Sequence, residues 1–296
     1  MADAAIHAGA RRAEALASRL PPLLVAAERV AATVAQGVHG RRRVGSGDSF
    51  WQFRPFVTGD PVARIDWRQS AKSGRPEPHG WFIRETEWEA AQTVCLWHDA
   101  SASMRWRSAL APVEKHERAA LLLLALAALL LRGGERVALM EPGSRPLAGR
   151  AALDRLAQAL SASSTDAPGL PPEMPLPRHA RVVLFGDFLS PLPEIQAVVA
   201  RFAGIPVTGT LLQVLDPAED LLPYAGRIRF RGLEREGETL IPRVEGIRDA
   251  YTARLRAQQD GLRALCAAAG FGFAIHRTDH SPEAALLGLY TAMAAQ

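Results

Sequence analysis

Strand-like and helix-like hydrophobic patterns alternate from about residue 92 to the end of the chain. Short apolar runs typical of buried strands occupy residues 93–98, 136–140, 181–186, 206–212 and 271–275. Segments with helical spacing occupy residues 114–132, 151–161, 191–203, 245–269 and 282–295. This order predicts an α/β fold, in which a mostly parallel, Rossmann-type sheet carries helices on both of its faces.

The apolar run at residues 119–131 bears on whether this chain crosses a membrane. It is 13 residues long, whereas a helix that crosses a bilayer needs about 20. We therefore expect a core helix that is buried on every side. The start of the chain also lacks the pattern of a secretory signal, which favours a cytoplasmic protein.

Composition divides the chain into three regions. Residues 1–40 are rich in Ala, Leu and Arg and predict N-terminal helices, whereas residues 41–91 are rich in Gly, Arg and Trp and predict short strands and turns. Residues 92–296 form the α/β domain. Within it, residues 227–241 predict a short hairpin added at an edge of the sheet, and residues 168–177 a proline-rich surface loop.

One carboxylate and two hydroxyls follow the first strand of this domain, in the sequence Asp99, Ser101 and Ser103. Asp187 follows the strand at 181–186. Ligands of open α/β sheets bind at the carboxyl ends of the strands, and hard cations such as Mg²⁺ prefer oxygen ligands. The sequence therefore predicts a metal site at this edge. The alternative is that Asp187 only helps Ser190 to start the next helix.

Residues 92–296 resemble a von Willebrand factor A domain. The metal-ion-dependent adhesion site of that family uses Asp-x-Ser-x-Ser, a Thr on a second loop and an Asp on a third. Asp99, Ser101 and Ser103 match the first part, and Asp187 matches the third. The second loop, residues 143–151, contains Ser144 but no Thr. The resemblance implies bound Mg²⁺ or Mn²⁺ with Ser144 as the substitute for Thr, and the alternative is a degenerate adhesion site.

A second resemblance covers residues 41–296 and rests on an ordered signature before the α/β domain. Its candidate interaction residues are Arg54, Gly59, Asp60, Arg64, Asp66, Trp67, Arg68 and Ser70. The run resembles the signature of the bacterial family called domain of unknown function fifty-eight. This implies partnership with AAA+ ATPases of the MoxR type and a role in assembling or remodelling protein complexes. The same resemblance implies membrane-anchored von Willebrand factor A proteins as further partners, which would place this chain at the inner membrane.

The signature also has a physical interpretation without the family. Gly59-Asp60-Pro61 predicts a turn. On an extended strand, Asp66 and Arg68 would point the same way, and a buried network that braces this segment against the sheet is favoured over a ligand site. The Trp and Arg side chains suit core packing or a protein-binding face.

Other classes of function have weaker support. The formal charge is +4 with basic residues spread along the chain, so nucleic-acid binding is not expected. His98 precedes Asp99 and faces away from Ser101, which argues against a hydrolase. We expect a non-enzymatic adaptor that acts through the predicted metal site. The alternatives are a metal-independent scaffold that acts through residues 41–90 and, with less support, a hydrolase or a nucleic-acid-binding protein.

Overall fold

The computed structural model describes residues 24–32, 34–35, 50–60, 62, 65–76, 78–86, 92–149, 151–163, 167–233 and 237–294. The chain divides into two compact units. The sheet unit comprises Met1–His39 and Gln92–Gln296, and the small unit comprises Gly40–Ala91. Of the signature residues, Arg64 lies outside the described residues.

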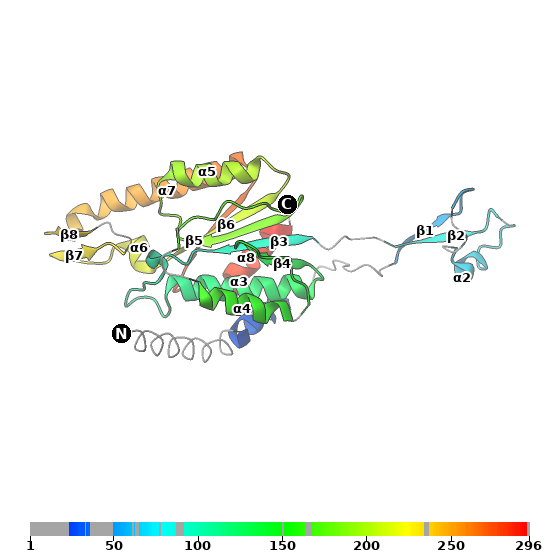
Figure 1. Cartoon of the computed structure of the whole chain (residues 1–296), viewed down its shortest axis with the longest axis horizontal. Helices are drawn as coiled ribbons and strands as arrows, with labels where there is room; N and C mark the ends of the chain where they lie inside the picture. Colours follow the sequence, from blue (N-terminus) through cyan, green and yellow to red (C-terminus); the bar gives the residue numbers. More distant parts are fainter. Residues whose placement is uncertain are drawn as a thin grey trace. The chain divides into compact units, whose positions relative to one another are not determined.

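The sheet unit is built around five strands, which Figure 1 shows side by side. They are β3 (Thr93–His98), β4 (Arg136–Leu139), β5 (Arg181–Gly186), β6 (Thr208–Leu215) and β9 (Gly272–Arg277). The order in the sheet is β4-β3-β5-β6-β9, and every pairing is parallel. The predicted parallel sheet is thus confirmed, and the arrangement is compatible with a Rossmann-like fold.

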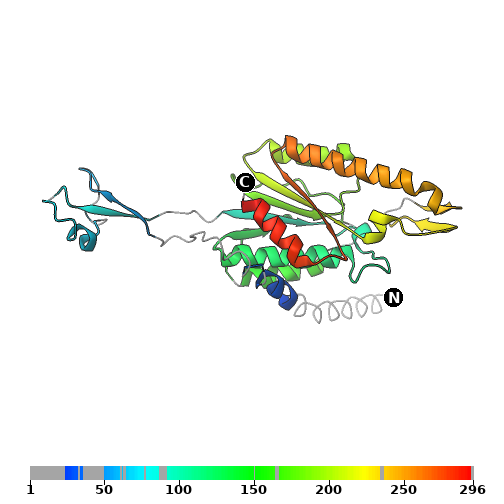
Figure 2. The same ribbon diagram turned by 180° about the vertical axis from the view of Figure 1, so that it is seen from behind.

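Helices cover both faces of this sheet, as predicted (Figures 1 and 2). One face carries α3 (Lys115–Arg132), α4 (Ala151–Ala162) and α8 (Pro282–Ala294), and the other carries α5 (Leu192–Ala203) and α7 (Arg248–Ala268). The apolar stretch of α3 is buried almost all round. Among the described helices, none combines the length and the hydropathy needed to cross a membrane.

The described part of the N-terminal helical segment belongs to the core of the sheet unit. Ala27, Val30, Ala31 and Val34 are almost fully buried in the same cluster as the leucines of α3. Their spacing of three and four residues puts them on one face of a helix. The burial of this apolar face therefore anchors the segment to the sheet unit.

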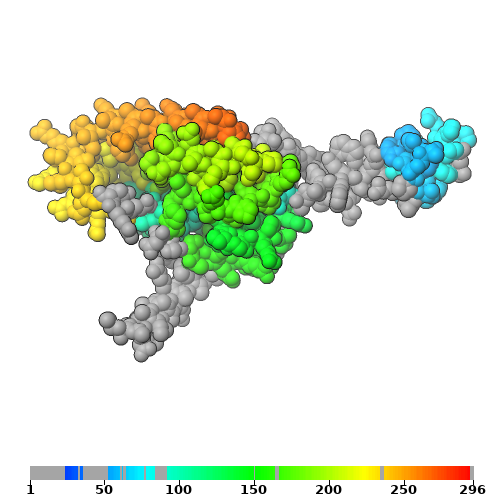
Figure 3. Space-filling view, turned by 45° about the horizontal axis from the view of Figure 1, so that its top comes forward, coloured from blue at the N-terminus to red at the C-terminus, as the bar shows by residue number. Residues whose placement is uncertain are grey.

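Short elements complete the carboxyl end of the sheet. They are η2 (Ala102–Met104), α6 (Pro217–Leu221), the hairpin of β7 (Ile228–Arg231) with β8 (Glu238–Ile241), and η3 (Val244–Ile247). The hairpin forms a two-stranded sheet of its own and stands at the same end of the sheet unit as α6 (Figure 1). In the space-filling view its yellow surface lies beside the orange surface of α7 (Figure 3). The predicted hairpin is confirmed, but its expected place at an edge of the main sheet was wrong, because β7 and β8 pair only with each other.

The small unit pairs β1 (Phe50–Pro55) with β2 (Phe82–Thr86) in an antiparallel hairpin and adds one helical turn, α2 (Trp67–Ser70). The extended conformation predicted around Asp66 holds as far as Asp66, whose N–H donates to the Phe82 carbonyl at 2.8 Å, but it ends there because α2 begins at Trp67. Asp66 caps α2 by accepting a hydrogen bond from the Gln69 N–H at 2.9 Å, and Asp is among the preferred capping residues. Arg68 is exposed on this turn, so the described contacts show no buried Asp-Arg network between the two.

Gly209 in β6 offers a test of how tightly the sheet packs. A Cβ at this position would overlap the ring of Phe271. We predict that Gly209→Ala lowers the free energy of unfolding by roughly 1–3 kcal/mol, since overpacking forces neighbouring groups to move. Gly288 in α8 is the control, because a Cβ there meets open space and Ala favours the helix by about 0.5–1 kcal/mol. Urea unfolding measures both changes, and equal stability of the two variants would contradict the packing.

Candidate functional site at the carboxyl edge of the sheet

Asp99 and Asp187 converge as predicted, because β3 and β5 are neighbouring parallel strands. The Ser103 hydroxyl donates to Asp187 Oδ2 at 2.9 Å, and the oxygens of Ser101 and Ser103 lie 3.1 Å apart. The Ser101 N–H donates to Asp99 Oδ1 at 2.9 Å. Asp99, Ser101 and Asp187 are at most 5% exposed. These four side chains form the oxygen cluster of the site.

The backbone after β5 allows the turn that carries Asp187 to lie close to Asp99. A Cβ on Gly186 would come within 3.2 Å of Asp99 Cβ, so the last residue of β5 has to be small. Phe188 then adopts φ of +48°, a left-handed conformation that is unusual for a large side chain. Its ring is buried beside Trp97, with the ring centroids 6.2 Å apart. The turn after β5 is thus held by packing, and it fixes the direction of Asp187.

A buried lysine joins the oxygen cluster. Lys115, at the start of α3, is 1% exposed, and its Nζ donates to Asp187 Oδ2 at 2.9 Å and to Glu219 Oε1 at 2.5 Å. Burial alone would lower the pKa of Lys115, but the attraction of the two carboxylates outweighs it and raises the pKa above its usual value. Burial raises the pKa of Glu219, against the effect of Lys115.

Glu219 is held by the local structure that follows β6. Asp216 caps α6 by accepting the Ala218 N–H at 2.8 Å, and Glu219 accepts the Asp216 N–H at 2.9 Å. Together they form a capping box with Pro217 at the first helical position. Asp216 also accepts the Ser108 N–H at 2.8 Å. The end of β6 is therefore tied to the loop that follows β3.

The oxygen cluster fits a divalent cation only in part. Neighbouring oxygen ligands of Mg²⁺, at roughly 2.0–2.1 Å from the ion, lie about 3 Å apart, and the two serine oxygens have this spacing. Asp187 Oδ2, however, already accepts hydrogen bonds from Ser103 and from Lys115. Across the described residues, no group of three or more His, Cys, Asp or Glu side chains is placed to hold a metal. The residues present do not fit a resident divalent cation, and Mg²⁺ or Mn²⁺ binding stays a prediction.

The described contacts do not bring Ser144 to the oxygen cluster. Ser144 lies in a turn after β4, where its N–H donates to the Glu141 carbonyl at 3.0 Å. Gly169, in the proline-rich loop, approaches the cluster instead. A Cβ on Gly169 would lie 3.6 Å from Asp99 Oδ2 and 3.7 Å from Ser101 Oγ. The loop over the cluster is therefore a different one from the loop that the sequence predicted.

A cleft of about 880 Å³ opens in front of the oxygen cluster. Asp99, Ser103 and Asp187 contribute to its lining, together with Glu219 of α6. The remaining lining includes apolar and aromatic side chains and two arginines from the β7–β8 hairpin and its surroundings: Leu189, Tyr224, Arg229, Phe230, Arg231, Leu233 and Tyr251. The cleft thus combines an acidic side with an aromatic and basic side.

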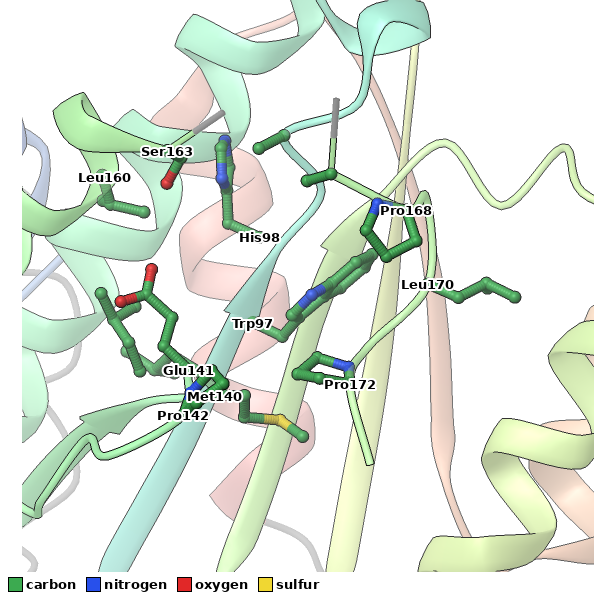
Figure 4. A pocket seen from close by; sticks show the side chains of 14 residues that line it. Trp97, His98, Met140, Glu141, Pro142, Leu160, Ser163, Pro168, Leu170 and Pro172 are labelled. Carbon is green, nitrogen blue, oxygen red and sulfur yellow. The ribbon is translucent and has the colours of Figure 1, made fainter. Parts of the chain in front are cut away.

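His98 faces a different cavity. It lines a pocket of about 210 Å³ together with Trp97, Met140, Leu160 and other mostly apolar residues (Figure 4). The His98 ring packs edge-on against His116, with centroids 4.7 Å apart. His98 is not among the residues that line the cleft. This agrees with its expected direction away from Ser101.

The described signature residues belong to the small unit, whereas the oxygen cluster belongs to the sheet unit. Arg54 forms a two-pronged ion pair with Asp60, at 2.6 and 2.7 Å. Gly59 adopts φ of +112° in the predicted turn. The Ser70 hydroxyl accepts the Phe82 N–H at 2.9 Å, while Trp67 is 55% exposed. These contacts give Arg54, Asp60 and Ser70 structural roles and leave Trp67 on the surface.

Fold and site together define an α/β protein with acidic and hydroxyl side chains at the carboxyl edge of a parallel sheet. The chain belongs to the family described as "Protein of unknown function DUF58", whose model matches residues 52–261. No curated protein matches the chain.

The solved structures that resemble this chain at low similarity include two bacterial proteins. One is the conserved hypothetical protein BatB from Bacteroides thetaiotaomicron, with 15% identity and a TM-score of 0.35. The other is an aerotolerance-related membrane protein from Bacteroides fragilis, with 14% identity and a TM-score of 0.40. Each match covers 70% of this chain and 100% of the other chain.

Sequence reasoning missed Lys115, Asp216 and Glu219. The predicted strand at 206–212 ended too early, since β6 runs to Leu215, so the acidic residue at its carboxyl end went unnoticed. The sequence Asp216-Pro217 with Glu219 is a helix-start signal that could have corrected this boundary. Lys115 had no such signal, because a charged residue at the start of a helix is normally exposed.

Two buried histidines, His98 and His276, and one partly buried histidine, His116, predict a pH dependence of stability. Burial lowers the pKa of His98 to about 3 and the pKa values of His116 and His276 to about 4. Between about pH 6.5 and 4 the unfolded chain therefore binds protons that the folded chain does not, and stability falls as pH falls. We predict a free energy of unfolding roughly 3–6 kcal/mol lower at pH 5 than at pH 7.

Urea unfolding at the two pH values measures this difference. His116→Gln removes one of the three groups, so the difference should shrink by about a third. A wild-type free energy of unfolding that does not change between pH 7 and pH 5 would contradict the assignment of neutral, buried imidazoles.

Proposed function

We propose that this chain is a non-enzymatic adaptor that docks a partner protein in the cleft at the carboxyl edge of its sheet. The observation that carries the proposal is the lining of the cleft. Tyr224 and Phe230 pack edge to face, with centroids 5.9 Å apart, and Arg229 and Arg231 beside them have side chains 69% and 79% exposed. Aromatic residues and arginine are the side chains that most often anchor protein interfaces.

The chemistry of the described cleft residues supports binding rather than catalysis. Of the residues that line it, none is a histidine, so no imidazole is placed to take a proton from Ser103. The Ser103 hydroxyl donates to Asp187, whose oxygen also accepts from Lys115. An active nucleophile needs a base that is available to take its proton, and the carboxylate that Ser103 contacts already accepts from the Lys115 ammonium. The groups of the oxygen cluster instead satisfy one another.

The partner that we propose is an AAA+ ATPase of the MoxR type from the same host. This part rests on the resemblance of the signature and of the A-type domain to the family. The same proposal makes the sheet unit a von Willebrand factor A-like domain. It also includes a cytoplasmic location at the inner membrane and contact with membrane-anchored A-domain proteins. Assembly or remodelling of protein complexes would be the result of the pairing.

Binding of the purified ATPase to the immobilised full chain, with ATP present, tests the proposal. We predict that the double variant Phe230→Ala/Arg231→Ala weakens binding by roughly 5- to 30-fold, since truncating an interface anchor costs about 1–2 kcal/mol. Arg256→Ala is the matched control, because Arg256 is an exposed arginine of α7 that does not line the cleft.

The small unit carries the alternative surface on which the partner protein could dock. Phe56 and Trp67 both pack edge-on against Trp81, at 5.3 and 5.6 Å between centroids, and Trp67 is largely exposed. Trp67→Ala is therefore the second variant in the same binding experiment. If Trp67→Ala abolishes binding while the cleft variant binds normally, the working surface is the small unit and the cleft proposal is wrong.

A further inference from the structure

We propose that the Lys115 ammonium is a built-in cation, which holds the oxygen cluster together in place of a divalent metal ion. The side chain is 1% exposed and extends from the first residue of α3 to Asp187 Oδ2 and Glu219 Oε1. Its two partners follow β5 and β6. One ammonium therefore joins the start of α3 to the turns that follow β5 and β6.

The hydrogen bonds form a continuous chain through this ammonium. Ser101 contacts Ser103, Ser103 donates to Asp187 Oδ2, and Lys115 donates to the same oxygen and to Glu219. A divalent ion bound to the Ser103 and Asp187 oxygens would have to displace the Ser103 proton from its acceptor. It would also sit close to the ammonium, in a region where charges are poorly screened. The ammonium and a metal ion thus compete for the same carboxylate.

The choice of lysine is informative in this chain. The sequence contains 33 arginines and only two lysines, Lys72 and Lys115. A guanidinium is a flat fork that suits two-pronged pairing, as in Arg54 with Asp60, whereas an ammonium is a compact charge with three donors. Oxygens that converge on a small volume favour the compact cation. The chain therefore has a lysine at the position where carboxylate oxygens converge as they would around a small cation.

Charge explains why the position needs a cation. Asp187 and Glu219 are largely buried. Asp99, which belongs to the same oxygen cluster, is 1% exposed. Buried carboxylates are stable only when paired or bound to a cation. Removing Lys115 would leave this pair of carboxylates without its ammonium. Under those conditions a divalent cation would become the available substitute.

The experiment uses the full chain as wild type, Lys115→Met and Lys72→Met, in EDTA and in millimolar Mg²⁺ or Mn²⁺. Thermal unfolding gives Tm, and electron paramagnetic resonance of Mn²⁺ gives binding directly. We expect the wild type and Lys72→Met to have the same Tm with and without metal and to bind no Mn²⁺. We expect Lys115→Met to lose roughly 5–15 °C in EDTA, to bind Mn²⁺ and to regain part of the lost Tm.

Two outcomes would overturn the inference. One is a wild-type protein that binds Mn²⁺ and gains Tm from it. The other is a Lys115→Met protein that is as stable as wild type in EDTA or gains nothing from Mn²⁺. If Lys115→Met does not fold in EDTA, Mn²⁺ should restore its folding, and failure to do so would count against the inference; the wild-type Mn²⁺ measurement still decides the first outcome. None of these measurements involves a partner protein, so the inference and the adaptor proposal fail independently.

Discussion

The oxygen Oδ2 of Asp187 is the acceptor on which the functional edge of the sheet depends. It receives the Ser103 hydroxyl from the segment after β3 and the Lys115 ammonium from α3, and that ammonium continues to Glu219 after β6. The carboxyl ends of three neighbouring strands are therefore tied through one buried ion-pair network. Because an unpaired buried charge is costly, the network keeps the oxygen cluster of the cleft in one arrangement, whatever binds there.

The position of the two aspartates was predictable for a simple reason. Parallel strands end at the same edge of a sheet, and the apolar runs that define β3 and β5 are followed directly by Asp99 and Asp187. The hydrophobic pattern also placed the long helices to within a few residues. What the pattern could not show was that β3 and β5 are neighbours, which the pairing of Leu96 with Val183 establishes.

The remaining part of the site depends on tertiary contacts that leave no mark in the pattern. Lys115 has the sequence context of an exposed helix start, and only the convergence of α3 with the turns after β5 and β6 buries it. Gly169 approaches Asp99 and Ser101 from a loop that was expected only to lie on the surface. In the small unit, the extended conformation ends at Asp66 and does not reach Arg68, because a local hydrogen bond from the Gln69 N–H to Asp66 starts a helical turn.

The most direct test of the account is a double-mutant cycle between Lys115 and Asp187. Urea unfolding of wild type, Lys115→Met, Asp187→Asn and the double variant gives the coupling free energy of the pair. The account predicts a coupling of roughly 1.5–3 kcal/mol, in the range measured for residues that share a hydrogen-bonded network. A coupling near zero would show that the ammonium and the carboxylate do not depend on each other, and the proposed organisation of the sheet edge would be wrong.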